Sequence, residues 1–210
     1  QLPVNVKEPD LTEYLAGVAN TRFTNIKSHM NKFCEALAQG NDIEQYLDME
    51  AYARFFLAND LSLNQEIGHP KSTFLYRENE NSKSSKLKFG PIWDFDWGYG
   101  YENSSSYCYN EATTSVMKTG MSGYSFLRDL TSLESFKKHY YRVWTEFMEN
   151  NPMEELADFI DSYYTFAESS FRNNTSVWGS SCGFTESDRD RHKSWIETRR
   201  AHIYNNLEKY

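Results

Sequence analysis

Residues 89–100 read FGPIWDFDWGYG, and this stretch decides how the rest of the chain is interpreted. Asp94 and Asp96 lie two positions apart among aromatic residues, and glycines follow them. If the stretch continues a β-strand, both carboxylates leave the same face, because side chains alternate along a strand. Carboxylate oxygens are ligands that Mg2+ and Mn2+ prefer. The stretch therefore predicts a divalent-metal site, although an aspartate that caps the turn into Gly98 accounts for it equally well.

A β-hairpin is predicted immediately before and within this stretch. Residues 73–76 and 87–89 are short β-type runs that flank a polar segment over 78–85. The second strand is expected to run past Gly90 and Pro91 into residues 92–97. From there to Gly123 the sequence is rich in Ser, Tyr and Thr, which predicts a long loop, and loops of this length are usually functional or disordered.

Helices are predicted on both sides of the hairpin, from apolar residues that recur at three- and four-residue spacing. Upstream we expect one helix over about 11–39 and a second that is capped by Asp48 and ends near Asn59. Downstream we expect three helices: one after a capping box of Thr131 and Glu134, one that begins at Asn151-Pro152, and one near 188–208. The predicted fold class is α+β, mainly α, with a small hairpin between helical segments.

Composition limits the functional classes that fit the chain. A length of 210 residues with 39% hydrophobic residues predicts one domain over 1–210. The formal net charge of −8 argues against nucleic acid as a partner, since binding to phosphates needs clustered Lys and Arg. No apolar stretch approaches the ~20 residues that a membrane-spanning helix needs. The chain begins at Gln1, so we expect it to be a fragment of a longer protein.

The sequence also offers sites for covalent modification. The cysteines are Cys34, Cys108 and Cys182, and none is spaced as a CxxC ligand pair. Cys34 lies on an apolar helix face and is expected to be a buried thiol, whereas a Cys108–Cys182 disulfide remains open for an oxidising compartment. Asn173 and Asn174 begin overlapping Asn-x-Ser/Thr sequences in what we expect to be a polar loop.

A second polar cluster spans residues 64–72, which read NQEIGHPKS. Its Gly and Pro predict a loop between a helix and the first hairpin strand. Glu66 in this loop could orient a hydroxyl nucleophile, with the side chain of Ser72 six residues later and a metal near Asp94. A plain polar connection is the alternative, and His69 alone is expected to be an exposed loop histidine.

The order of these motifs resembles that of the spore coat protein H (CotH) kinase family. The matching residues are Asn64-x-Glu66, Pro70-Lys71-Ser72-x-Phe74-x-Tyr76 and the string over 89–100. The specific part is Gly-Pro-x-Trp-Asp-Phe-Asp. The resemblance extends through nearly the whole chain, and residues 195–200, WIETRR, follow a helical pattern found after the acidic motif in that family.

The resemblance implies the C-terminal, larger lobe of an atypical protein kinase that uses Mg or Mn with ATP. In such kinases the first Asp of an Asp-Phe-Asp triplet holds the metal, a role that falls on Asp94, with Asp96 in support. The catalytic carboxylate falls on Glu66, where the family usually has Asp. Asn64 and Ser72 are expected to help bind the cofactor, although Ser72 stands where a kinase has a metal-binding Asn. A Gly-rich phosphate loop and nucleotide-gripping Lys are expected in an upstream lobe.

Three functions follow from these observations. The first is transfer of the terminal phosphoryl group of ATP to a protein Ser or Thr. The second is a catalytically silent interaction module that binds a coat or surface protein, and the resemblance makes a spore coat, cell surface or other extracytoplasmic location an option. The third is carbohydrate binding, suggested by the dense aromatic residues Trp97, Tyr99, Tyr101, Tyr107 and Tyr109.

Overall fold

The protein is described by a computed structural model that covers residues 4–7, 18–69, 72–79, 82–96, 98–100, 111–150, 152–179 and 184–207. The elements are α1 (Val18–Gln39), the 3-10 helix η1 (Ile43–Gln45), α2 (Met49–Ser62), the 3-10 helix η2 (Gln65–Gly68), β1 (Leu75–Tyr76), β2 (Lys88–Phe89), α3 (Tyr124–Thr131), α4 (Glu134–Glu149), α5 (Pro152–Trp178) and α6 (Glu186–Tyr204). The expected class, mainly helical α+β with a small hairpin, is confirmed.

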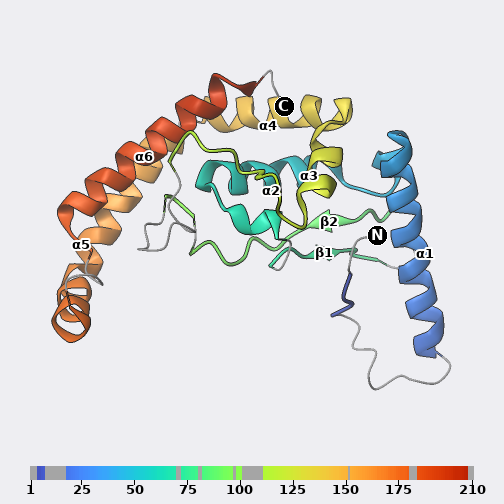
Figure 1. Ribbon diagram of the computed structural model, residues 1–210, viewed down its shortest axis with the longest axis horizontal. Helices are drawn as coiled ribbons and strands as arrows, with labels where there is room; N and C mark the ends of the chain where they lie inside the picture. The colour runs from blue at the N-terminus through green and yellow to red at the C-terminus, as the bar shows by residue number, and fades with distance from the viewer. Residues whose placement is uncertain are drawn as a thin grey trace.

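Helix α2 forms the centre of the core. It begins as expected at Asp48, whose side chain accepts a hydrogen bond from the Ala51 backbone N–H. Helix α4 packs along α2, while β2 and α6 also contact it, and Figure 1 shows α2 between α4 and the hairpin. Buried aromatic rings fill these contacts: Tyr52, Phe55, Phe56, Phe89, Phe136 and Tyr140. Burial of such rings contributes most of the stabilising free energy of a core this size.

The hairpin is shorter than the sequence predicts. β1 and β2 pair antiparallel, with Leu75 opposite Phe89 and Tyr76 opposite Lys88. β2 then ends at Phe89, a cis peptide bond joins Gly90 to Pro91, and no regular strand follows in residues 91–96. The expectation that Asp94 and Asp96 leave one face of a continuous strand is therefore wrong.

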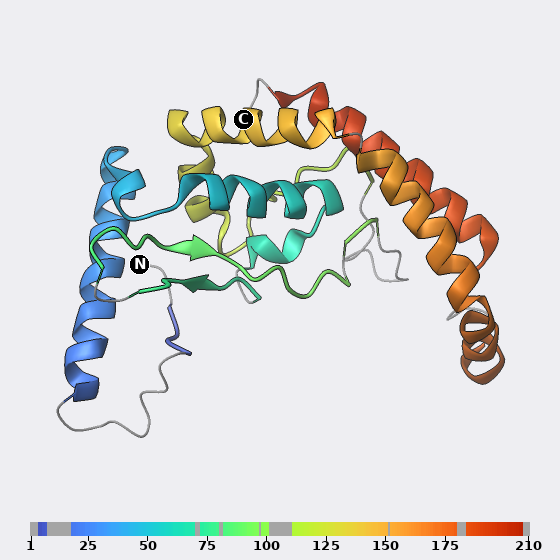
Figure 2. The same cartoon turned by 180° about the vertical axis from the view of Figure 1, so that it is seen from behind.

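Three long helices lie at the two ends of the molecule. Figure 1 places α1 at one end, and the antiparallel pair of α5 and α6 at the other, where the pair projects away from α2; Figure 2 shows the same arrangement from behind. Helix α6 begins with a capping box, in which the side chain of Thr185 accepts from the Asp188 N–H and the Asp188 carboxylate accepts from the Thr185 N–H. Among the described residues, no helix is both long and apolar enough to cross a membrane.

Several predicted boundaries need correction. Thr131 is not an N-cap: it ends α3 and its hydroxyl donates to the Leu127 carbonyl, while Leu133 occupies the N-cap position of α4 without a side-chain hydrogen bond. Helix α2 continues past Asn59 to Ser62.

Helix α5 begins at Pro152 as predicted, although Asn151 lies outside the described residues. Asn173 and Asn174 lie within α5 and not in a loop, because the helix continues to Trp178. Residues 11–17 of the first predicted helix, together with Cys108 and Cys182, fall outside the described residues. Cys34 is half-buried and free, and burial raises the pKa of its thiol.

Candidate functional site

Glu66 is positioned by a short 3-10 helix with a side-chain cap. Asn64 precedes η2, and its side-chain oxygen accepts a hydrogen bond from the Glu66 backbone N–H at 3.3 Å. The amide nitrogen of Asn64 donates to the Asn59 side-chain oxygen at 3.1 Å and to the Asp94 backbone carbonyl at 3.4 Å. One buried asparagine thus joins the end of α2, the Glu66 turn and the acidic motif.

A second hydrogen bond joins the two predicted motifs. The Ser72 hydroxyl donates to Asp94 Oδ2 at 2.9 Å. Asp94 is exposed, and its backbone adopts the left-handed conformation with φ 66°. Ser72 lies before β1 and Asp94 lies after β2, so the hairpin brings together two residues that are 22 positions apart.

Glu66, Asn64 and Ser72 line one small cleft, which has room for about one water molecule. Its other walls are Phe55, Asn59, Ile67, Thr73, Trp93 and Phe95. Oε2 of Glu66 is buried and has no hydrogen-bond partner among the described residues. Burial of a carboxylate oxygen without a partner is costly. The Glu66 carboxylate is therefore a candidate acceptor for a proton or a hydrogen bond from a ligand.

Unusual backbone conformations gather around this site. Among the described residues, four residues other than glycine have positive φ. Asp94 belongs to the site, while Leu63 (φ 53°) precedes Asn64 and Tyr99 (φ 58°) follows the acidic motif. Such conformations cost roughly 1–3 kcal/mol each and cluster at functional sites. The fourth, Asp42, lies before η1 and away from this segment of the chain.

The donors around Asp94 fit a divalent cation only in part. Mg2+ holds its ligands at about 2.0–2.1 Å, so two ligands at right angles are about 2.9 Å apart. Asp94 Oδ2 and the Ser72 oxygen have this separation. However, no group of three His, Cys, Asp or Glu side chains in the described residues is arranged to hold a metal. The same 2.9 Å distance is that of a hydrogen bond, so a cation here would have Asp94 and Ser72 as ligands and would need water and phosphate for its other positions.

Asp96 is not tied to this cluster. Its side chain is exposed, and in the part of the chain that the structure describes it makes no hydrogen bond or ion pair. The structure thus brings together Asn64, Glu66, Ser72 and Asp94. Among the described residues, no hydrogen bond or ion pair holds the Asp96 carboxylate in place relative to these four. His69 is half-buried at the C-cap of η2, and its backbone N–H donates to the Glu66 carbonyl.

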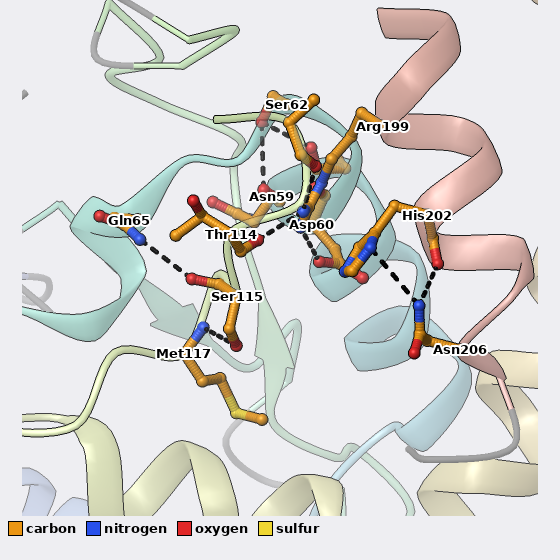
Figure 3. Close-up of polar contacts among 12 residues, drawn as sticks. Asn59, Asp60, Ser62, Gln65, Thr114, Ser115, Met117, Arg199, His202 and Asn206 are labelled. Atoms are coloured by element: carbon orange, nitrogen blue, oxygen red, sulfur yellow. Dashed lines mark hydrogen bonds and ion pairs between the residues drawn. The ribbon is translucent and has the colours of Figure 1, made fainter. Parts of the chain in front are cut away.

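Residues 111–123 pack against η2 and form hydrogen bonds with it. Gln65 donates through its side-chain amide to the Ser115 carbonyl at 2.9 Å, which Figure 3 shows, and the Gly123 N–H donates to the Gly68 carbonyl at 2.7 Å. A Cβ at Gly68 would overlap the sulfur of Met121, so the Met121 side chain packs directly against the Gly68 backbone and would have to move for a larger residue. The Glu66 turn is therefore held on both sides.

Helix α6 holds the residues that follow the acidic motif. The Tyr99 N–H donates to the Ser62 carbonyl, and the Tyr99 ring packs against Trp195 and His192. Gly100 has φ 69°, and a Cβ there would overlap the Trp195 indole. Burial lowers the pKa of His192. Of the five aromatic residues in the carbohydrate hypothesis, Tyr99 packs against these two side chains, and the other four lie outside the described residues.

A buried charged network fastens α6 to α2 (Figure 3). Arg199 and Asp60 are fully buried, and their ion pair has an N–O distance of 2.6 Å. Arg199 also donates to the backbone carbonyls of Asp60, Ala112 and Thr114, while the Tyr140 hydroxyl donates to the second Asp60 oxygen at 2.6 Å. No local sequence pattern predicts this network. The one available signal was Arg199 itself, within the Trp-Ile-x-x-Arg-Arg pattern.

The comparisons with known proteins identify the family. Residues 6–203 match the family profile described as CotH kinase protein. The match covers most of the chain, so the chain belongs to the CotH kinase family, as its motifs predict. Membership suggests a kinase-like function with general use of a nucleotide and a metal. No curated protein and no solved structure matches the chain.

Proposed function

We propose that this chain contributes the catalytic carboxylate and a metal ligand to an atypical protein kinase, which transfers the terminal phosphoryl group of ATP to a protein Ser or Thr with Mg2+ or Mn2+. The observation that carries this proposal is the joining of the two motifs. The Ser72 hydroxyl donates to the Asp94 carboxylate, and Ser72 and Glu66 line the same cleft, while Oε2 of Glu66 has no hydrogen-bond partner among the described residues.

Asp94 and Ser72 are the proposed metal ligands. The hydroxyl of Ser72 now donates to Asp94, and it can rotate its hydrogen away so that both oxygens face an ion. A bound Mg2+ or Mn2+ would neutralise charge that develops on the transferred phosphoryl group. Asp94 is exposed, and the Ser72 hydroxyl is the oxygen ligand that the structure places beside it. We therefore expect the protein alone to bind the ion weakly, and the phosphates of the nucleotide to supply further ligands to the ion. Asp96 could add a second carboxylate.

Glu66 is the proposed catalytic carboxylate. Its free oxygen can accept the proton of an acceptor hydroxyl while the hydroxyl oxygen bonds to phosphorus and ADP leaves. The family usually has Asp at this position, and Glu places the carboxylate one bond length further from the backbone. A displacement of ~1 Å can change a rate about a hundredfold. The short η2 turn, fixed by the Asn64 cap, sets where this longer side chain ends.

The test is incorporation of labelled terminal phosphate from ATP into protein Ser or Thr, using the natural full-length protein with Mn2+ or Mg2+. Asp94→Ala should abolish incorporation, and Glu66→Gln should reduce it at least a hundredfold. Glu35→Ala removes an exposed carboxylate on α1 and serves as the matched control. If incorporation is absent in the unaltered protein, or survives Asp94→Ala, the proposal is wrong.

Two substitutions place the residue of the kinase pattern at position 72 and that of the family pattern at position 66, and each should affect a different step. Ser72→Asn supplies the amide oxygen found in kinases, so we expect tighter binding of the Mn2+–nucleotide complex. Glu66→Asp should change the rate of transfer without changing nucleotide affinity, because that side chain faces the acceptor in this proposal. A loss of nucleotide binding in Glu66→Asp would contradict the assigned role.

A catalytically silent interaction module is the second candidate. The small size of the cleft favours it, since ligand pockets usually enclose hundreds of Å3. Titration with Mn2+ and ATP separates the two candidates. A silent module shows no Mn2+-dependent nucleotide binding, and its Asp94→Ala variant behaves as the unaltered protein does.

A further inference from the structure

Helix α5 turns a line of aromatic side chains to solvent. Phe159 is 61% exposed, Tyr163 54% and Phe166 84%. The ring centroids of Phe159 and Tyr163 are 5.9 Å apart, and those of Tyr163 and Phe166 are 6.4 Å apart. We call these three residues the α5 aromatic seam. Monomeric proteins rarely leave contiguous large apolar side chains open unless the surface binds something.

The seam is not used for packing within the described chain. Helix α5 contacts α6 through other residues, since Asp161 pairs with Lys193 and the Arg189 guanidinium lies 5.2 Å from the Tyr164 ring. Figures 1 and 2 show that the α5–α6 pair projects beyond the rest of the molecule. A partner could therefore approach the seam without displacing the core.

The spacing of the seam indicates the shape of its partner. The intervals from Phe159 to Tyr163 and from Tyr163 to Phe166 are four and three residues. The next two positions of this spacing are the polar Ser170 and Asn173, so the apolar seam is confined to Phe159, Tyr163 and Phe166. Intervals that alternate between four and three residues average 3.5 residues, which is the spacing of the apolar contact residues in a coiled coil. A surface with this repeat runs along the helix axis, so the matching surface is another α-helix.

Charge indicates which helix would fit. Helix α5 carries acidic Glu154, Glu155, Asp158, Asp161 and Glu168 against the basic Arg172. Glu155 and Asp158 lie beside the start of the seam, both are exposed, and neither has an ion pair in the residues that the structure describes. If the partner were the α5 helix of a second copy, its one basic residue would be Arg172, which already forms an ion pair with Glu168 at 3.4 Å. The acidic end therefore favours a partner with Lys or Arg.

We propose that the α5 aromatic seam binds a basic amphipathic helix of another protein. The partner's apolar residues pack against Phe159, Tyr163 and Phe166, and its Lys or Arg residues lie near Glu155 and Asp158. This inference does not depend on catalysis, because the seam lies on α5 and none of its residues lines the cleft.

The test uses a fluorescein-labelled 21-residue peptide with Leu at heptad positions a and d and Lys at e and g. Fluorescence anisotropy at 150 mM salt, with nanomolar peptide, should show saturable binding to the 210-residue chain. Phe166→Ser and Phe159→Ser should each weaken binding at least tenfold. The matched control Tyr141→Ser, which alters a 60% exposed tyrosine on α4, should leave the affinity unchanged. Circular dichroism confirms that each variant is folded.

Two further measurements can overturn the proposal. A peptide with Glu in place of Lys, and one with the Leu positions scrambled, should bind at least tenfold more weakly; equal affinity for either would refute a specific helical interface. Sedimentation should show a monomer. A dimer that Phe166→Ser dissociates would overturn the proposal in favour of a second copy, and equal binding by Phe166→Ser and the unaltered chain would overturn it outright.

Discussion

Removing Arg199 should destabilise the protein more than removing any exposed ion pair. In Arg199→Met the fully buried Asp60 carboxylate loses the Arg199 counter-charge and keeps the hydrogen bond from the Tyr140 hydroxyl. Breaking a buried ion pair by removing one partner costs about 3–5 kcal/mol. The variant also leaves the Ala112 and Thr114 carbonyls without the Arg199 donor. Since whole domains have about 5–15 kcal/mol of stability, a large fraction should be lost.

Urea unfolding at 25 °C, followed by far-UV circular dichroism, measures this loss as a change in midpoint at constant slope. Arg142→Met is the matched control, because Arg142 is 44% exposed in its pairs with Glu50 and Glu146, and exposed pairs contribute about 0–1 kcal/mol. A double variant, Asp60→Leu with Arg199→Met, should lose at least 2 kcal/mol less than the sum of the single variants, since no unpaired charge remains. A cost below about 1 kcal/mol for Arg199→Met, or strict additivity, would refute the reasoning.

Three further outcomes can be measured, the first with the full-length protein and the other two with this chain. Gly100→Ala should weaken Mn2+–nucleotide binding at least tenfold, because the added methyl group overlaps Trp195 and shifts the chain that follows Asp94 and Asp96. Trp195→Ala in the same protein should restore part of the affinity. No restoration would contradict the inference that packing of Trp195 on Gly100 positions the acidic motif. Burial lowers the pKa of His192 below its unfolded value of about 6.5, so stability is fully present above that pH and falls as the pH drops through the folded pKa; His192→Gln should flatten this fall in pH-dependent unfolding. Thr185→Ala should cost about 1 kcal/mol in urea by removing the N-cap of α6, whereas Thr185→Ser should be nearly neutral.

Local sequence signals predicted much of the fold. The Asp48 cap and the helical start at Pro152 are decided by neighbouring residues, and both are confirmed. The hairpin also follows from its two β-type runs. The predicted extension of its second strand is wrong because Pro91 has no N–H to donate and Asp94 adopts a left-handed conformation.

The candidate site could be predicted only as far as motifs reach. The order of Asn64, Glu66, Ser72 and Asp94 indicated one site, and the structure joins these residues by hydrogen bonds, while their catalytic roles stay predictions. The left-handed backbone of Asp94 could not be read from the string, because aspartate also suits a regular turn. Likewise, Arg199 gave no sign that its partner lies 139 positions earlier, since long-range pairing leaves no local periodicity.

The long sequence separation within the Asp60–Arg199 pair has a consequence for synthesis of the protein. The chain is made from its N-terminus, and at about 5–20 residues per second the ribosome needs roughly 7–28 s to add the 139 positions between the two partners. During that interval the Asp60 carboxylate has no guanidinium, so it stays hydrated and α2 stays open on that side. Newly made chains therefore finish folding only when α6 leaves the ribosome, and chaperones that bind exposed apolar surface have that time to act.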